Sequence, residues 1–169
     1  GVIYLRALDA NTSDEQNADQ VFDHCCVATI EPMYLAQALD KVEWRKMPSI
    51  YFITQSVQVL DDNDAIPHPT QGALWGLGRV FATEYPSFKS SLLDLPASIN
   101  NELIKQFADQ ILCDEHEPEI AIRAGNRFVN RLRPLTETLL HQHAEQPFIC
   151  ADHDSAVLAW EAAVEADNE

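Results

Sequence analysis

The sequence predicts an α/β fold with a mainly parallel sheet, helices on both of its faces and a C-terminal β-hairpin. Nearly continuous apolar runs begin at residues 1, 50 and 90, and such runs are typical of strands buried on both faces of a parallel sheet. The segments between these runs carry apolar residues at helical spacing. The alternation of the two patterns indicates successive strand–helix–strand units.

The first unit combines a strand with a long helical region. Residues 1–8 are mostly apolar, and we expect this strand near the centre of the sheet. Ser13 and Gln16 form a capping box that begins a helix extending to about Lys41. Because a proline inside a helix costs about 3 kcal/mol, we expect a break or kink at residues 30–32, before the helix resumes. The predicted apolar side contains Phe22, Cys26, Thr29, Met33, Leu35 and Leu39.

The second strand, residues 50–53, is followed by Thr54, Gln55 and Ser56. In a doubly wound sheet, ligands and catalytic groups lie at the carboxyl ends of the strands. This point resembles short-chain reductases, whose catalytic serine follows the corresponding strand, and the resemblance makes Ser56 the candidate for that serine. A lone serine has nothing to lower its proton affinity, so we interpret Ser56 as a cap of the strand end.

Residues 69–86 carry the strongest helical pattern of the chain, with Leu74, Leu77 and Phe81 on one side. Thr70 fits the N-cap position, and Pro86 ends the helix. Two motifs of short-chain dehydrogenases lie in and just after this stretch. Their residues are the cofactor-loop glycines Gly72, Gly76 and Gly78 and the catalytic pair Tyr85 and Lys89.

The sequence context argues against both motifs. A phosphate-binding glycine loop follows a buried strand, whereas Pro67 and Pro69 precede these glycines and exclude a central strand there. Pro86 directly follows Tyr85 and ends the helix, so Tyr85 and Lys89 cannot share a helical face. We expect tight helix packing at the glycines and a solvated turn at Tyr85. We therefore assign no catalytic, cofactor-binding or metal-binding residue.

The remaining elements are a strand, a helix and a hairpin. Asp94 lies in the strand at residues 90–95, and without a glycine loop it has no ribose-binding role. Residues 100–113 form an amphipathic helix, and we expect a hairpin around residues 124–126, where Gly125 and Asn126 can take positive φ. The helix residues predicted to face inward are Leu103, Ile104, Phe107, Ile111 and Leu112.

The formal net charge is −16, which disfavours nucleic acids and anionic membranes as partners and favours solubility. No run of about 18 apolar residues predicts a membrane span. Four basic residues nevertheless cluster within the hairpin. These arginines form either an anion or domain contact or a set of solvent-facing hairpin positions; they are Arg123, Arg127, Arg131 and Arg133.

Three further groups of residues do not fit the pattern of a metal or redox site. After Asp61 the sixth position is Ile66 and the twelfth is Gly72, which does not fit a calcium loop. His141 and His143 point to different faces of a helix. The four cysteines form no C-x-x-C motif and are expected to be small buried hydrophobes in a reducing cytoplasm. They are Cys25, Cys26, Cys113 and Cys150.

Five segments together resemble the ketoreductase structural subdomain of modular polyketide synthases. ALWGLGRVFATEYP, residues 73–86, is similar to the A-x-W-G-L-G-R-x-x-x-x-E-x-P helix of that subdomain. The other four occur in the family's order. They are GVIYLRALD (1–9), PSIYFITQSVQVL (48–60), SSLLDLP (90–96) and EIAIRAGNRFVNRLRP (119–134).

This resemblance implies a truncated, catalytically empty Rossmann-like unit of the short-chain dehydrogenase type. Such a unit braces a separate NADPH-dependent ketoreductase catalytic subdomain that reduces acyl-carrier-bound β-keto intermediates. NADPH and phosphopantetheine are implied for the parent synthase and no cofactor for this chain. The implied partners are the catalytic subdomain, dehydratase, enoylreductase and acyl carrier protein domains of a cytoplasmic polyketide synthase or a related fatty acid synthase.

The resemblance also implies a domain organisation. Residues 1–134 correspond to the structural subdomain without the family's first βαβ portion, and residues 135–146 to a linker. Residues 147–169 resemble the lead-in strand pair of an enoylreductase domain.

Two other functions remain open. One is a degenerate or active short-chain NADPH reductase that uses Ser56, Tyr85 and Lys89. The other is a free-standing acidic interaction module, which would be monomeric and stable without neighbours.

Overall fold

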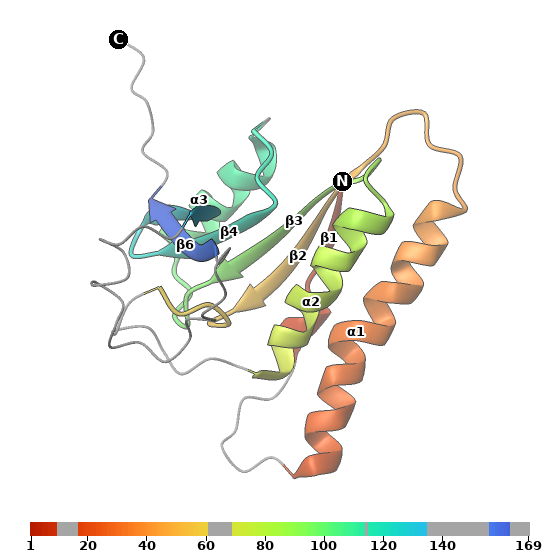
Figure 1. The fold of residues 1–169 in the computed structure, drawn as a ribbon, viewed down its shortest axis with the longest axis horizontal. Helices are drawn as coiled ribbons and strands as arrows, with labels where there is room; N and C mark the ends of the chain where they lie inside the picture. Colours follow the sequence, from red (N-terminus) through yellow and green to blue (C-terminus); the bar gives the residue numbers. More distant parts are fainter. Residues whose placement is uncertain (10–16, 61–68, 114, 135–155, 163–169) are drawn as a thin grey trace.

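The computed structural model describes residues 1–9, 17–60, 69–113, 115–134 and 156–162. They form a sheet whose six strands lie side by side in chain order (Figure 1). The parallel strands are β1 (Val2–Tyr4), β2 (Ser49–Gln55), β3 (Lys89–Leu95) and β4 (Glu119–Arg123). The antiparallel strands are β5 (Asn126–Pro134) and β6 (Ala156–Ala162). The predicted α/β fold with a mainly parallel sheet and a C-terminal hairpin is confirmed.

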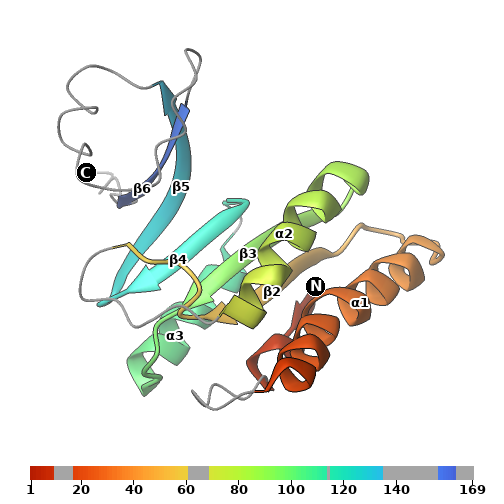
Figure 2. The ribbon, with the colours of Figure 1, turned by 60° about the horizontal axis from the view of Figure 1, so that its bottom comes forward.

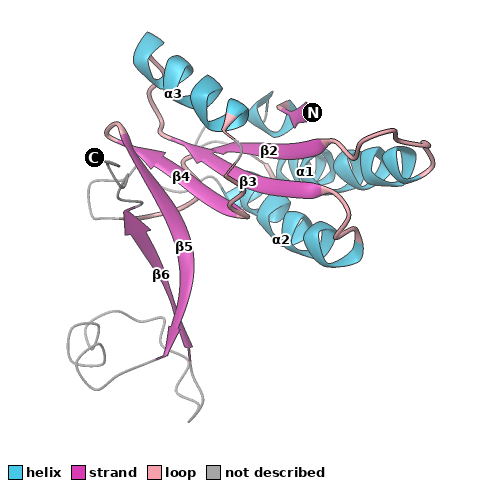
Figure 3. Cartoon of the chain, turned by 90° about the horizontal axis from the view of Figure 1, so that it is seen from above, coloured by secondary structure: helices cyan, strands magenta, loops and turns pink. Residues whose placement is uncertain are grey.

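Helices cover both faces of the sheet. The helices α1 (Ala18–Asp40) and α2 (Pro69–Glu84) lie side by side on one face (Figure 2). The helix α3 (Asn101–Leu112) lies on the other (Figure 3). No helix in this described part of the chain is long and apolar enough to cross a membrane.

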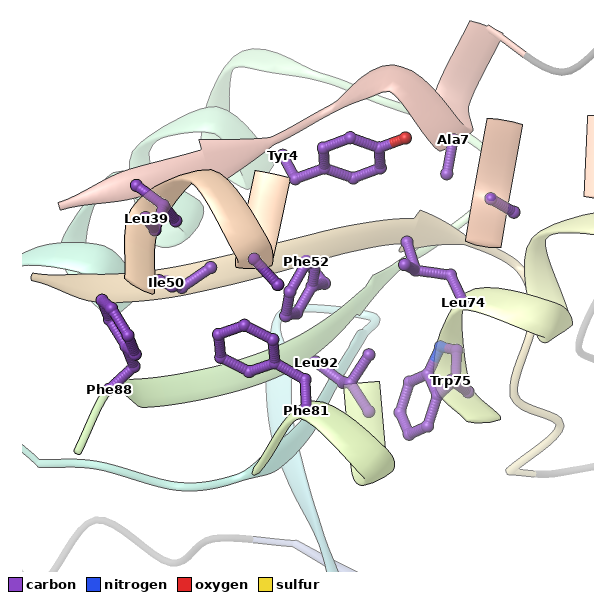
Figure 4. Packing of buried hydrophobic residues seen from close by; sticks show 12 residues of the cluster. Tyr4, Ala7, Leu39, Ile50, Phe52, Leu74, Trp75, Phe81, Phe88 and Leu92 are labelled. Carbon is purple, nitrogen blue, oxygen red and sulfur yellow. The ribbon is translucent and has the colours of Figure 1, made fainter. Parts of the chain in front are cut away.

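Each face of the sheet has its own hydrophobic core, because successive strand residues point to opposite faces. Phe52 and Leu92 pack with Leu74 and Phe81 of α2 (Figure 4). The neighbouring strand residues form the second core, under α3. This core includes Ile53, Leu93, Leu103, Ile120 and Ile122.

The first strand differs from its prediction in length and in position. β1 has only three residues and lies at the edge of the described sheet, and a 3₁₀ helix, η1 (Arg6–Asp9), follows it. Tyr4 is buried in the core under α1, and its hydroxyl donates to Val27 O on that helix at 2.6 Å. An apolar run does not distinguish a central strand from residues that pack under a helix, so the prediction of a central strand over residues 1–8 was wrong.

The helix α1 begins at Ala18 and passes through Pro32 without interruption. Its capping box consists of Asn17 and Gln20, each of whose side chains accepts the other's backbone N–H, at 2.9 and 3.0 Å. The predicted capping residues 13 and 16 lie outside the described residues. The predicted break at Pro32 was wrong. Pro32 lies in the middle of the buried side of α1, and burial of that side compensates for the lost hydrogen bond.

The buried side of α1 consists of Ala28, Pro32, Ala36 and Leu39. Phe22 and Met33, which were predicted to face inward, are 67% and 38% exposed. The helix therefore has two apolar stripes, and the stripe with the smaller side chains packs against α2 and the sheet. Periodicity reveals a stripe but does not reveal which of two stripes is buried.

The later elements match their predictions except at a few positions. α2 ends at Glu84, before Pro86, but it begins at Pro69, so Thr70 lies inside the helix and is not its N-cap. In α3, Asn100 is the N-cap, but Ile104 and Leu112 are exposed rather than inward.

The hairpin turn uses a different residue from the one predicted. Ala124 and Gly125 have φ values of 48° and 78°, whereas Asn126 was expected to take positive φ together with Gly125. After the turn, β5 continues beyond β4 and pairs with β6 from Phe128 opposite Ala162 to Pro134 opposite Ala156 (Figure 3). Assignment of residues 147–169 to a following domain stays a prediction.

Candidate functional site

The carboxyl edge of the sheet brings together several buried polar side chains. β2 and β3 run in register, so that Thr54 lies opposite Asp94 and Gln55 opposite Leu95. Thr54 and Asp94 are fully buried although both are polar. This is the edge at which doubly wound proteins bind their ligands.

The Asp94 carboxylate is the centre of this cluster. Its Oδ1 accepts hydrogen bonds from the Thr54 hydroxyl at 2.6 Å and from the Val57 N–H at 3.1 Å. Its Oδ2 accepts the N–H groups of Val57 at 3.1 Å and Gln58 at 3.0 Å. Arg123 Nη2 donates to the same Oδ2 at 2.6 Å. A buried carboxylate is stable only when it is paired and hydrogen-bonded in this way.

Arg123 reaches the cluster from the end of β4, and only 11% of its side chain is exposed. Its guanidinium also donates to Gln58 O at 2.7 Å and to Ile122 O at 2.9 Å. The pair of Asp94 and Arg123 therefore holds the segment that follows β2 against the sheet edge.

The helix α2 closes the cluster from the side. Trp75 Nε1 donates to Thr54 Oγ1 at 3.0 Å, and Gln71 Oε1 accepts the Gln55 N–H at 2.9 Å. Both α2 side chains are buried. Among the described residues, side chains of β2, β3, β4 and α2 thus hydrogen-bond to one another at the edge where a doubly wound fold would hold a cofactor.

Ser56 directly follows β2, as predicted, and is buried with φ of 53°. Its N–H donates to Leu95 O at 2.9 Å, which extends the contact between β2 and β3 by one residue. Tyr85 and Lys89 lie at the opposite edge of the sheet, in the turn after α2 and at the start of β3. Lys89 pairs with Ser49, the first residue of β2.

Ser56 and Lys89 are separated by the length of a whole strand. At about 3.3 Å per residue the separation is roughly 20 Å, too far for a shared reaction. The structure therefore does not bring Ser56, Tyr85 and Lys89 together. Instead, the Tyr85 ring packs against Phe81 and Phe88, with ring centroids 5.1 and 6.4 Å apart.

All three motif glycines lie within α2 and not in a loop between a strand and a helix. A Cβ on Gly78 would lie 2.6 Å from Leu92 Cδ2 on β3, so glycine is needed there for close packing. Gly72 would make only an ordinary contact with Val57, and a Cβ on Gly76 would meet nothing within 4 Å.

The hairpin arginines bind carboxylates of their own chain. Arg131 donates to both carboxylate oxygens of Glu117, at 2.8 and 2.6 Å, and Arg127 lies 3.2 Å from Glu115. With Arg123 held by Asp94, three of the four form internal ion pairs, and the Arg133 side chain lies outside the described residues. A contact of this hairpin with an anion or another domain stays a prediction.

Glu119 belongs to the same row of acidic residues. It accepts Arg79 Nε at 2.7 Å and Asn130 Nδ2 at 2.6 Å. Burial raises the pKa of Glu119, but the hydrogen bonds from Arg79 and Asn130 outweigh burial and hold this pKa below 4.5. Hydrogen bonds from Arg131 likewise hold the pKa of Glu117 below 4.5. The sequence signal for these ion pairs is the alternation of acidic residues at positions 115, 117 and 119.

The other candidates form no site in the part of the chain that the structure describes. Residues 61–64, 141, 143 and 150 fall outside it. Cys25 and Cys26 are half-buried on α1, but Cys113 is exposed, contrary to prediction. Among the described residues, no three His, Cys, Asp or Glu side chains come together as a metal site. A cavity between α2 and β3 measures about 30 Å³, whereas small-molecule sites measure roughly 300–1,000 Å³.

Comparison with known proteins shows polyketide synthases as relatives. The chain is 28% identical over 132 residues to polyketide synthase GfsA of Streptomyces halstedii, covering 78% of this chain and 2% of that protein. It is 26% identical over 136 residues to a phenolphthiocerol/phthiocerol polyketide synthase of Mycobacterium tuberculosis, covering 80% of this chain and 8% of that synthase. No protein-family model matches. The chain thus spans less than a tenth of the length of either relative.

The fold of the chain also resembles that of a solved structure. That structure is a C2-type ketoreductase from a modular polyketide synthase. The TM-score is 0.58 and the sequence identity 24%, over 80% of this chain and 28% of the ketoreductase. The chain is thus similar in sequence to polyketide synthases and similar in fold to a ketoreductase from a modular polyketide synthase.

Proposed function

We propose that this chain is a non-catalytic structural subdomain that braces an NADPH-dependent ketoreductase catalytic subdomain. Within a polyketide synthase, that partner would reduce the β-keto group of intermediates carried on phosphopantetheine. The partners of the assembly would be the neighbouring synthase domains, among them dehydratase, enoylreductase and acyl carrier protein. We expect this assembly in the cytoplasm.

One observation carries the proposal: the carboxyl edge of the sheet is filled. Asp94, Arg123, Thr54 and Trp75 occupy the place where a doubly wound reductase holds its cofactor. The separation of roughly 20 Å between Ser56 and Lys89 argues against the alternative of a short-chain reductase built on Ser56, Tyr85 and Lys89.

The outward side of α1 provides a surface for contact with the catalytic subdomain. Phe22, Ile30 and Met33 recur at helical spacing on the stripe opposite the buried one, and all three are exposed. Exposed apolar stripes of this kind mark contacts with other proteins or domains. We assign docking of the catalytic subdomain to this stripe.

A cofactor titration tests the first part of the proposal. NADPH is added to the complete chain while the fluorescence of its tryptophans and its melting temperature are followed. We expect no saturable response up to millimolar NADPH, because the cofactor edge is closed. Saturable binding that Gly76→Trp abolishes would contradict the proposal and restore the glycine motif as a phosphate site.

Association with the catalytic subdomain in trans tests the second part. Phe22→Asp combined with Met33→Asp places two charges on the outward stripe of α1. We expect this variant to lower the affinity for the catalytic subdomain by at least tenfold, since two buried apolar contacts would be lost. Leu112→Asp, on α3 at the other face of the sheet, is the matched control and should leave affinity unchanged. Equal affinity of all three proteins would exclude α1 as the docking surface.

A further inference from the structure

The surroundings of the Asp94 carboxylate have the composition of an anion-binding site. In the described part of the chain, the groups that donate hydrogen bonds to it are one hydroxyl, two backbone N–H groups and one guanidinium. We infer that the carboxyl edge of this sheet is an anion-binding site which the chain occupies with its own carboxylate. This inference goes beyond the bracing function and does not depend on it.

The direction of the Thr54 hydroxyl is fixed by its other partner. Thr54 Oγ1 already accepts the Trp75 Nε1–H at 3.0 Å, so its own hydrogen is directed to Asp94 Oδ1 at 2.6 Å. A site lined only by hydrogen-bond donors suits a ligand that only accepts hydrogen bonds, such as an ionised carboxylate. A neutral alcohol or an amide would leave some of these donors unpaired.

The backbone contributes a concave arrangement of donors. Ser56 has φ of 53°, and the two N–H groups that follow it, those of Val57 and Gln58, converge on one carboxylate. Consecutive N–H groups that follow a left-handed residue form the nests by which proteins bind anions. The positive φ of Ser56, which is unusual for a residue other than glycine, thus has a structural purpose.

Arg123 has partners besides the Asp94 carboxylate. Its guanidinium also donates to the carbonyl oxygens of Gln58 and Ile122, at 2.7 and 2.9 Å. These bonds keep the guanidinium directed at the edge when the Asp94 side chain is shortened. Asp94→Gly removes the carboxylate, keeps these two bonds of Arg123 and opens a space of the size of a CH₂–COO⁻ group. A small planar oxyanion of the carboxylate class fits this space, and formate is the smallest probe.

The test is rescue of Asp94→Gly by formate in the complete chain. Melting temperature is measured in sodium formate and in sodium chloride of equal ionic strength. For a dissociation constant of about 10 mM, 100 mM formate should raise the melting temperature by roughly 3–6 °C more in Asp94→Gly than in the wild type. The double variant Asp94→Gly with Arg123→Met should lose this gain. If Asp94→Gly is unfolded in chloride, the readout is recovery of the emission of the buried Trp75 on addition of formate.

A second variant tests the same site without opening a space. Asp94→Asn keeps the volume of the side chain but removes its charge, so formate should have no specific effect. Because an amide oxygen is a weaker hydrogen-bond acceptor than a carboxylate, this variant should speed hydrogen exchange at the Val57 and Gln58 amides by at least tenfold. Arg79→Met, which breaks the ion pair at the other edge of the sheet, is the control and should leave these two amides unchanged. The inference is overturned if formate affects Asp94→Gly no more than the wild type, or if the double variant keeps the full gain.

Discussion

Gly76 and Gly78 stand two residues apart on α2 and have opposite surroundings. A side chain on Gly78 would meet three atoms of Leu92 at 2.6 to 3.0 Å, whereas one on Gly76 would point into open space. Leu92 is itself buried in the core between α2 and the sheet, so it has little room to move away. Glycine is therefore required for close packing at position 78, whereas at position 76 it is an exposed helix residue.

Alanine at these two positions should shift stability in opposite directions. Gly78→Ala should destabilise the fold by about 1–3 kcal/mol through overpacking, offset in part by the better helix propensity of alanine. Gly76→Ala should stabilise it by up to about 1 kcal/mol, because only the propensity changes. Urea unfolding of both variants measures the difference. Stabilisation of similar size in both would show that α2 does not approach β3 as closely as described.

At the scale of elements, α2 joins the hydrophobic core to the carboxyl edge of the sheet. Trp75 fills the core with its ring and donates its N–H to Thr54 of β2 at 3.0 Å. Trp44, in contrast, follows α1 in a loop, is 36% exposed and donates to Leu39 O at 2.9 Å. The two tryptophans thus provide a matched pair, one in the core and one near the surface.

Truncation of these tryptophans should separate core packing from surface contact. Trp75→Ala should lower the free energy of unfolding by about 3–5 kcal/mol, as large aromatic truncations in cores do. Trp44→Ala should cost clearly less, because a third of its side chain is already in water. Thermal and urea unfolding give both values. An unchanged melting temperature for Trp75→Ala would be incompatible with a core that includes α2.

At the scale of the whole molecule, the acidic chain uses its arginines as internal partners for selected carboxylates. The Arg79 partner of Glu119 and the Arg131 partner of Glu117 both bind with two hydrogen bonds. These pairs connect α2 and β5 to β4 and the segment that precedes it. Hydrogen bonds from these arginines hold the pKa of each glutamate below its usual range.

The lowered pKa of Glu119 predicts a pH-dependent contribution to stability. The unfolded chain takes up a proton at Glu119 before the folded protein does as the pH falls. The contribution is therefore complete above about pH 4.5 and is lost as the pH falls through the folded-state pKa. Wild type should be more stable than Glu119→Gln at about pH 6, and the difference should shrink as the pH falls through the folded-state pKa of Glu119. Urea midpoints across this range measure the effect, with Glu43→Gln in an exposed loop as the control. A constant difference at all pH values would exclude the linkage.

The elements that followed from the sequence are those specified by local patterns. β2, β3, α2 and the β4–β5 hairpin lie where their apolar runs, helical periodicity and turn residues indicated. The helix predicted through the three glycines was also confirmed, because helical periodicity is a local feature. The acidic residues at alternate positions 115, 117 and 119 are visible in the sequence. They can be matched to arginine partners only once the register of the hairpin is known.

Other features depend on residues that are distant in the chain. The position of β1 at the edge and the choice of which α1 stripe is buried depend on how α1 packs against α2 and the sheet, which no local window contains. The closure of the carboxyl edge requires Asp94 to meet Arg123, 29 residues later, and Val57, 37 residues earlier. Hydrophobic periodicity specifies which side of an element is apolar, but it carries no information on which partner that side meets. That information exists only once the strands are in register and the polar groups at their ends are brought within hydrogen-bonding distance.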